Sequence, residues 1–383
     1  MTGFRHLGVP DVLNGVGPAT RLGGLPLHPE VWDAMQEALR SPVRMDVLGR
    51  EVGKHIADLL GVPGAYVTSG ASAALLLGTA VCIAADDPPA VDQLPDTSGL
   101  RDTVVIQKAH RDPYDRAVTA TGARLLEIGY PESTHPGELE RALDANVAAV
   151  LYRPGRPGNL LPLADTAHIA HRAGVPVIVD GALFVPPVDR LHDYFSDGAD
   201  LVAVSGGKGF RGPQASGLLL GRADLIDAVA AHHQDLDERA QTWPIRPAAT
   251  PPRHGIGRPT KVGREQVAGL LAAIERYLRA PGADEGPGIA ELQHLETALL
   301  GDGLEVERIH DPALNVPTLR LKLGDRRRTD ALLRALARRA TPIYLGENEA
   351  WNGAVQINPM ALGPGHGADI AAAITEELAN LDE

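Results

Sequence analysis

Short apolar runs alternate with longer stretches of helical periodicity through the middle of the chain, from about residue 65 to residue 220. The runs are short and rich in Val, Ile and Leu, which is typical of strands buried on both faces. They predict strands at Ala65–Thr68, Thr103–Gln107, Arg124–Glu127, Ala148–Tyr152, Val175–Val179, Leu201–Ser205 and Gly217–Leu220.

The stretches between these runs carry apolar residues at helical spacing. They predict helices at Ser72–Ala84, Tyr114–Thr121, Gly137–Leu143, Thr166–Arg172 and Asp189–Ser196. Strands joined by crossover helices form a mostly parallel sheet that helices cover on both faces. The sequence therefore predicts an α/β fold for this part of the chain.

Other patterns flank this region. A Gly- and Pro-rich arm runs to about Gly24, and helices are predicted at Pro29–Leu39 and Arg50–Leu60. The polar, Pro-containing segment Asp86–Ser98 is predicted to be a surface loop. The Pro- and Arg-containing passage Thr242–Pro259 interrupts the alternation.

A smaller α+β region is predicted towards the carboxyl terminus. A long helix at Gly263–Arg279 precedes it, and its strands and helices are expected at Thr318–Leu323, Thr329–Arg338, Ile343–Tyr344, Val355–Ile357 and His366–Leu378. We expect three parts: an arm and helix over residues 1–45, a large α/β domain over 46–260, and a linking helix with the small domain over 261–383.

Composition narrows the function classes. Of 383 residues, 44% are hydrophobic and 22% charged, which is ordinary for a soluble globular protein. The net charge of −13 and an aromatic content of 4% argue against nucleic acid as a partner. Cys82 is the single cysteine, which excludes an intrachain disulfide and a multi-cysteine metal site. No signal-like or membrane-spanning apolar stretch is present, so we expect a cytoplasmic protein without a membrane partner.

Three motifs follow predicted strands, where α/β proteins place their ligands. The first, Thr68–Ser72, has the sequence Thr-Ser-Gly-Ala-Ser and precedes a helix. Small residues there expose backbone N–H groups that suit a phosphate, although a plain helix cap has the same pattern. The second is Asp180, which closes an apolar run and could form a turn or pair with a buried cationic ring nitrogen.

The third motif is a lysine among glycines, Ser205-Gly-Gly-Lys-Gly-Phe-Arg-Gly-Pro-Gln214. A solvated surface charge explains Lys208 poorly, because its small neighbours allow a planar ligand to approach. A lysine whose pKa is lowered by its site can form an imine, and Ser205 could bind a phosphate.

Together these motifs resemble the fold type I (aminotransferase-like) enzymes that use pyridoxal 5'-phosphate (PLP). The resemblance implies a phosphate loop at Ser69-Gly70-Ala71, an aspartate facing the pyridine nitrogen at Asp180, and a Schiff-base lysine at Lys208. It also implies Ala182 and Ser205 as cofactor contacts, and His110 as the residue that stacks on the ring, the alternative for His110 being a helix cap or a surface turn.

Within that fold the sequence is similar to the selenocysteine synthase (SelA)-like group, and especially to D-glucosaminate-6-phosphate ammonia-lyase-like enzymes. The similar motifs are Val67–Ala71, Val105–Gln107 with His110-Arg111 and Tyr114-Asp115, Ser205–Gln214, Thr20–Gly24, Gly257–Gly263 and Ile357–Met360. Two segments that we expect to face the substrate, Gly17–Ala19 and Tyr152–Asn159, depart from the group's pattern.

The resemblance implies chemistry at Cα and Cβ of a small amino acid, through an external aldimine and a Cα carbanion. It favours α,β-elimination of the ammonia-lyase type or β-replacement. The alternatives are a racemase, aldolase or aminotransferase, a selenium transferase acting on aminoacyl-tRNA, and a non-catalytic PLP-binding protein. The residues alone leave the racemase, the aldolase and the aminotransferase open. The net charge of −13 disfavours the enzyme that acts on aminoacyl-tRNA.

Several cations are candidates for binding an anionic substrate or phosphate, and each has the alternative of a structural or solvated role. They are Arg21, Arg211, Arg258, Lys261 and Arg320. Arg153 and Arg156 lie in the divergent Tyr152–Asn159 segment and are expected to set side-chain preference, although a solvated loop explains either one alone.

The arm around Arg21 and the passage 257–263 carry cations but little apolar character, so we expect them to complete a neighbouring subunit's site in a homodimer or larger even assembly. No metal site is expected. His168 and His171 lack a third ligand, and His232-His233 with Asp235 has the character of a polar helix end.

Overall fold

The computed structural model describes residues 4–235, 237, 254–279, 286–301 and 304–382. The chain divides into two compact units, the first formed by residues 1–26 with 277–383 and the second by residues 27–276. The expected parts were 1–45, 46–260 and 261–383. The observed second unit instead includes the helices at Pro29–Leu39 and most of Arg264–Arg279, and the first unit combines the amino-terminal arm with the small domain.

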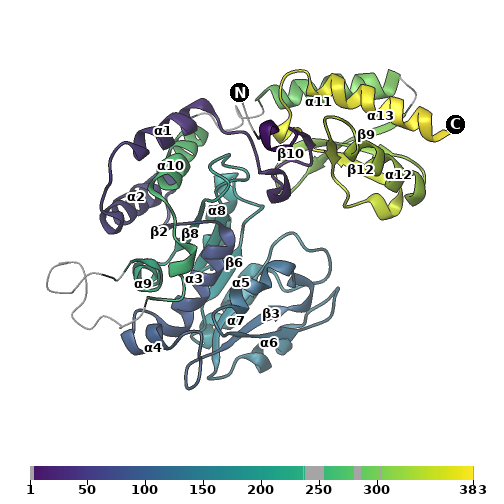
Figure 1. Cartoon of the computed structure of the whole chain (residues 1–383). Helices are drawn as coiled ribbons and strands as arrows, with labels where there is room; N and C mark the ends of the chain where they lie inside the picture. The colour runs from purple at the N-terminus through teal and green to yellow at the C-terminus, as the bar shows by residue number, and fades with distance from the viewer. Residues whose placement is uncertain (1–3, 236, 238–253, 280–285, 302–303, 383) are drawn as a thin grey trace. The chain divides into compact units, whose positions relative to one another are not determined.

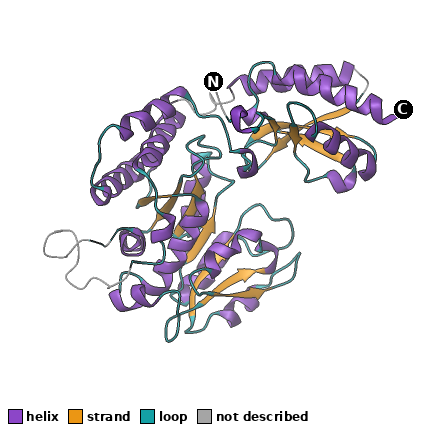
Figure 2. Cartoon of the chain, in the orientation of Figure 1, coloured by secondary structure: helices purple, strands orange, loops and turns teal. Residues whose placement is uncertain are grey.

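A seven-stranded sheet forms the centre of the larger unit (Figures 1 and 2). Its spatial order is β2-β8-β7-β6-β5-β3-β4. Strands β7, β6, β5, β3 and β4 run parallel to one another, whereas β8 is antiparallel to both β7 and β2. The strands are β2 (Ala65–Thr68), β3 (Thr103–Gln107), β4 (Arg124–Ile128), β5 (Val147–Tyr152), β6 (Val177–Asp180), β7 (Leu201–Ser205) and β8 (Gly217–Gly221).

Because β8 reverses direction between β2 and β7, strand β2 points the same way as the parallel strands. The carboxyl ends of β2, β3, β5, β6 and β7 therefore share one edge of the sheet. Polar residues follow each of these ends, so this edge is where the candidate site assembles.

Helices cover both faces of this sheet. On one face lies α3 (Ala71–Ala84), an Ala- and Leu-rich helix whose side chains are mostly buried. Ile178 of β6 joins the apolar cluster around α3, while its neighbours Val177 and Val179 are equally buried but point to the other face. The helices of this unit are α1 (Pro29–Leu39), α2 (Met45–Leu60), α3, α4 (Pro88–Gln93), α5 (Arg116–Thr119), α6 (Pro136–Ala142), α7 (Leu163–Arg172), α8 (Val188–Ser196), α9 (Ala223–His233) and α10 (Arg264–Arg279).

The smaller unit has a three-stranded antiparallel sheet of order β12-β10-β9 and a parallel pair of β1 and β11. Helices α11 and α13 pack against each other, and a core of leucines and isoleucines fills the unit. The elements are β1 (Leu13–Gly15), α11 (Gly286–Gly301), β9 (Glu305–Asp311), β10 (Val316–Lys322), α12 (Arg326–Ala337), β11 (Ile343–Leu345), β12 (Ala354–Ile357) and α13 (His366–Asp382).

The predicted strands of the large sheet are confirmed, with bounds that differ by at most two residues. The prediction of a surface loop over Asp86–Ser98 is wrong for Pro88–Gln93, which form α4. This short helix forms because Asp87 accepts a hydrogen bond from the N–H of Ala90 and because Ala90 and Val91 are buried. Residues 242–253 of the interrupting passage lie outside the described residues.

His232 and His233 were expected at a polar helix end, and they do form the carboxyl-terminal end of α9. Both side chains are buried, and each ring is hydrogen-bonded, His232 to the carbonyl of Ala85 and His233 to the hydroxyl of Tyr66 and the carbonyl of Thr260. Burial lowers the pKa of both rings. Their role is therefore to join α9 to neighbouring segments.

No helix within the described ranges is both long and apolar enough to cross a bilayer.

Candidate active site

The expected phosphate loop connects β2 to α3. Gly70 lies between them with φ +143°, a conformation that side chains rarely adopt, and no heavy atom lies within 4 Å of the place a Cβ would occupy. The first hydrogen bond of α3 runs from the N–H of Ala74 to the carbonyl of Gly70. The N-cap residue Gly70 provides no side-chain cap, so the first N–H groups of α3 are not satisfied by a capping side chain at this positive helix end.

Lys208 lies in the tight connection between β7 and β8. The N–H of Arg211 donates to the carbonyl of Lys208 at 2.9 Å, and a Cβ on the preceding Gly207 would lie 2.9 Å from the Cα of Gln214. The loop is therefore packed closely around a half-buried lysine. Burial lowers the pKa of Lys208, against the opposing effects of Asp180 and Asp112. Within the described part of the chain, its ammonium group has no hydrogen-bond or ion-pair partner.

Asp180 ends β6 and is only 8% exposed. Its Oδ1 accepts a hydrogen bond from the N–H of Ala182 at 3.2 Å. Its Oδ2 accepts one from Nε of Arg153 at 3.0 Å, and Nη2 of the same guanidinium lies 2.9 Å from this oxygen. Asp180 is therefore held by a backbone group on one oxygen and by a buried arginine on the other.

His110 follows β3 and is 1% exposed. Its ring meets that of Tyr152 edge to face, with centroids 4.7 Å apart, and its Nδ1 accepts a hydrogen bond from the N–H of Arg153 at 3.4 Å. Burial, with the charges of Arg153 and Arg156, lowers the pKa of His110 to about 4. The ring is therefore neutral at pH 7, and the bond to Nδ1 selects the tautomer with its proton on Nε2.

The alternative of a solvated loop is wrong for Arg153, whereas its expected effect on substrate side-chain preference stays a prediction. Arg153 is 6% exposed and binds Asp180, the main-chain oxygen of His110 and, at 3.3 Å, Oδ1 of Asp115. Only Arg156 keeps the expected position at the surface, where its Nη2 lies 3.1 Å from Oδ2 of Asp112. An arginine directly after a buried strand was the sequence signal that could have indicated this burial.

The remaining anion-binding candidates are distributed over the two units. In the larger unit, Arg258 pairs with Asp235 at 2.8 Å, Lys261 is exposed, and Arg211 adopts a left-handed conformation with φ +58°. In the smaller unit, Arg320 pairs with Glu349 at 2.7 Å and with Glu307 at 3.2 Å, which neutralises its charge. Arg21, also in this unit, is more than half exposed and lies 4.0 Å from Glu347.

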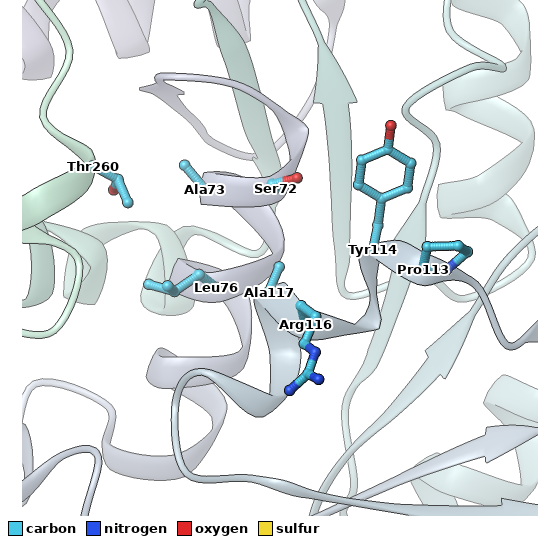
Figure 3. A pocket seen from close by; sticks show the side chains of 8 residues that line it. All are labelled: Ser72, Ala73, Leu76, Pro113, Tyr114, Arg116, Ala117 and Thr260. Carbon is cyan, nitrogen blue, oxygen red and sulfur yellow. The ribbon is translucent and has the colours of Figure 1, made fainter. Parts of the chain in front are cut away.

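A separate pocket of about 270 Å³ lies beside the phosphate loop (Figure 3). Its walls come from α3, from the turn that begins at Pro113 and from Thr260, and Tyr114 rises along one side. Lys208, Asp180 and His110 do not line it. The pocket is thus a neighbour of the candidate site and does not contain its reactive groups.

The comparison with known proteins points to one family. The chain is 31% identical to D-glucosaminate-6-phosphate ammonia lyase of Salmonella typhimurium over 281 residues, covering 72% of this chain and 69% of that protein. It is 30% identical to 5'-C-glycyluridine monooxygenase-decarboxylase of a Streptomyces species over 376 residues, covering 94% and 88%. A selenium transferase of Moorella thermoacetica that acts on L-seryl-tRNA(Sec) is 24% identical over 67% of this chain and 58% of its own.

This chain belongs to the SelA-like family of fold type I PLP-dependent enzymes. A solved structure of D-glucosaminate-6-phosphate ammonia-lyase matches all of both chains with a TM-score of 0.83 and 27% identity. A serine palmitoyltransferase from S. paucimobilis with bound PLP matches 97% of this chain and 89% of its own with a TM-score of 0.56, and at 14% identity shows the fold alone. No protein-family model matches the chain.

The family confirms three expectations from the sequence: the fold class, the PLP cofactor and a PLP-dependent enzyme of lyase type. The residues at the sheet edge fit such a cofactor. An uncapped helix end behind Gly70 suits a phosphate, Lys208 has an amine without a partner in the described part of the chain, and Asp180 offers a carboxylate.

Proposed function

We propose that the chain catalyses PLP-dependent α,β-elimination or β-replacement on a small amino acid. The proposal rests on Lys208, which is half-buried at the sheet edge where β2, β6 and β7 end. Burial lowers the pKa of this lysine, and the negative charge of Asp180 opposes that effect. A lysine whose pKa is lowered by burial is a better nucleophile and base than a solvated lysine. The ammonia-lyase relative supports elimination as the reaction.

Each site residue has a distinct task in this proposal. Lys208 would bind the aldehyde carbon of the cofactor, the N–H groups of Gly70 and Ala71 would bind its phosphate together with Ser205, and Asp180 would accept a hydrogen bond from the protonated ring nitrogen. The neutral ring of His110 covers the face of the cofactor, and Ala182 contributes through its N–H, which orients Asp180.

When bound, PLP withdraws electron density from Cα of an amino acid joined to it through the amino group. Lys208, released when the substrate attaches, takes the proton from Cα onto Nζ. The lowered pKa of Lys208 leaves more of the amine neutral and able to accept that proton. The substituent on Cβ then leaves with its bonding electrons, and hydrolysis by water yields a keto acid and ammonia.

Oxidative decarboxylation at Cα is the second candidate. The relative with the more extensive match to this chain is a monooxygenase-decarboxylase, at the same level of identity as the ammonia lyase. That reaction breaks the bond from Cα to the carboxylate and consumes dioxygen, so it differs from elimination in both its co-substrate and its products.

We further propose a homodimer, a small-molecule substrate and a cytoplasmic location, with no nucleic acid partner. Trp32, Leu39 and Val43 are exposed on and after α1, which supports burial of this surface by a second copy. The net charge of −13 supports a substrate other than nucleic acid.

A panel of amino acids, including ones with β-leaving groups and ones bearing a nucleoside, distinguishes these reactions. Incubation in deuterated water is followed by NMR for exchange at Cα, with assays for keto acid, ammonia, carbon dioxide and dioxygen. Exchange with keto acid and ammonia supports elimination, whereas dioxygen uptake with carbon dioxide supports the second candidate. Exchange with inversion alone indicates a racemase. Consumption of an aminoacyl-tRNA without exchange of any amino acid would overturn the small-molecule proposal.

A further inference from the structure

A buried guanidinium joins three of the loops that form the candidate site. Arg153, directly after β5, contacts Asp180 at the end of β6, the main-chain oxygen of His110 after β3, and Asp115 in the following turn. All four residues are nearly inaccessible to solvent. A buried charge is costly unless it is paired, so this arginine is held in place by the partners it connects.

Arg153 divides its charge between two carboxylates. Nε and Nη2 lie 3.0 and 2.9 Å from Oδ2 of Asp180, and Nη1 lies 3.3 Å from Oδ1 of Asp115. Asp115 has a second cationic partner in Arg111, at 2.5 Å, and Arg111 also pairs with Glu127. These five side chains comprise two cations and three anions, so Asp180 is partly but not completely neutralised.

Asp180 is oriented by protein groups on both of its oxygens. Oδ1 accepts a hydrogen bond from the N–H of Ala182, and Oδ2 accepts one from Nε of Arg153. A carboxylate has about four acceptor positions, so room remains for one further N–H donor. The ring nitrogen of the cofactor is the donor that the proposed function assigns to it.

We propose that Arg153 is a positioning residue that acts on PLP through Asp180: it fixes this carboxylate and takes up part of its charge, so that the ring nitrogen releases its proton at a lower pH than it would beside an unpaired aspartate. This rests on the proposed role of Asp180. A ring nitrogen that is less firmly protonated withdraws electrons from Cα less strongly. Arg153 thereby adjusts how strongly the cofactor withdraws electrons from Cα, without contacting the cofactor.

The same residue also acts on the ring face. The N–H of Arg153 donates to Nδ1 of His110, and its guanidinium helps to keep that imidazole neutral. Arg153 thus acts on Asp180 through its side chain and on His110 through its main-chain N–H and its charge.

The test measures the protonation of the ring nitrogen directly. The holoprotein is prepared with PLP labelled with ¹⁵N in the ring, and the ¹⁵N chemical shift is followed against pH. Arg153→Met should raise the midpoint of this titration by about one pH unit or more, because Asp180 then lacks its cation. Arg153→Lys, which keeps the charge, should stay closer to the wild-type midpoint.

Asp115→Asn should shift the titration midpoint of the ring nitrogen in the opposite direction. It removes the carboxylate that competes for Arg153, so Arg153 neutralises Asp180 more completely and the midpoint should fall. Loss of a merely structural contact would not produce shifts of opposite sign in these two variants. Arg222→Met is the matched control, since Arg222 pairs with the buried Asp200 at 3.1 Å, next to the amino-terminal end of β7. The titration midpoint of the ring nitrogen in Arg222→Met should equal that in the wild type.

Unchanged midpoints in both Arg153→Met and Asp115→Asn would overturn the inference while leaving the proposed function intact. Failure of the wild-type protein to bind PLP would instead overturn the proposed function. If Arg153→Met does not fold, Asp115→Asn carries the test alone, and a midpoint equal to or above the wild-type value counts against the inference. In the apoprotein, NMR of His110 gives a second readout. Arg153→Met should raise the pKa of His110 above its wild-type value, because a nearby cation is lost while the burial of the ring remains, and Arg153→Lys should raise it less; equal shifts in the two variants would contradict the assigned role of that charge.

Discussion

Burial of Lys208 is the single-residue feature that most directly indicates chemistry. Lys208→Ala should abolish covalent attachment of PLP, which borohydride reduction followed by mass spectrometry of the labelled peptide detects. Lys54→Ala on the exposed surface of α2 is the control and should retain the label on Lys208. A labelled peptide from another lysine in the wild-type protein would assign the attachment elsewhere.

We expect Asp180 to contribute through its charge. Asp180→Asn keeps the size of the side chain but removes the carboxylate that is proposed to keep the ring nitrogen protonated. The variant should retain PLP and lose at least about 10²-fold in turnover, measured as kcat with PLP occupancy determined in the same samples. Turnover near that of the wild type would give Asp180 a structural role only.

His110 makes the stability of the apoprotein depend on pH. Its pKa is about 4 when folded and near 6.5 when unfolded, so between these values the unfolded chain binds the extra proton. His110 therefore lowers the free energy of unfolding as pH falls from 6.5 towards 4, by on the order of 3 kcal/mol. Denaturant unfolding of the wild type and of His110→Gln across this range should show a shallower loss in the variant. Equal slopes would contradict the assignment.

At the scale of whole elements, the larger unit was predictable because its strands are uninterrupted apolar runs. Val104–Ile106 and Leu201–Val204 are buried throughout. Because a strand buried on both faces needs apolar residues at every position, these strands are visible in the sequence as continuous apolar runs. The edge strand β9 was missed because its residues are mostly polar and partly exposed, and β1 was missed because it has only three residues in a Gly-rich arm. Short edge elements depend on tertiary pairing more than on their own composition.

In the candidate site, too, local sequence predicts some features, and others depend on tertiary pairing. The strand-end positions of Lys208, Asp180 and the Ser69–Ala71 loop were predictable because each lies at or shortly after the end of a buried strand, within a distinctive local pattern. The pairing of Arg153 with Asp180 was not, because β5 and β6 are neighbours only through the sheet and the two residues are 27 positions apart. Local sequence indicates which side chains reach the edge, and strand order decides which of them meet.

The expected phosphate loop lies where the end of β2 and the start of β8 approach each other closely. A Cβ on Gly217 of β8 would lie 2.6 Å from the carbonyl carbon of Gly70 and 2.7 Å from its Cα, and backbone atoms cannot move aside as a flexible side chain can. Gly217→Ala should therefore displace the loop, weaken PLP binding by tenfold or more and destabilise the protein by about 1–3 kcal/mol. Spectroscopic titration with PLP and thermal unfolding measure the two effects.

Gly99→Ala is the matched control for that substitution. Gly99 has φ +80° and no heavy atom within 4 Å of the place a Cβ would occupy, so alanine there adds backbone strain away from the site. It should lower stability while leaving PLP affinity unchanged. Equal PLP affinities for the Gly217 and Gly99 variants would show that the loop tolerates the displacement.

At the scale of the whole molecule, the exposed cation Lys261 tests whether one subunit completes the site of another. Lys261 has no ion-pair partner within the described ranges and lies just after Arg258–Thr260, in a passage expected to reach a neighbouring copy. If it serves the neighbour's phosphate, Lys261→Ala should weaken PLP binding and activity in a homodimer. Light scattering establishes the oligomeric state at the concentrations used, and full activity in a monomer would exclude this arrangement.

Complementation then decides which subunit Lys261 serves. Lys208→Ala subunits mixed with Lys261→Ala subunits reassort into hybrids in which one site lacks both residues and the other has both. Random reassortment makes half of the dimers hybrid, each with one intact site, so roughly a quarter of wild-type activity should return. If Lys261 instead acted within its own subunit, every site in the mixture would lack one of the two residues, and the mixed sample would show only the average of the two variants alone.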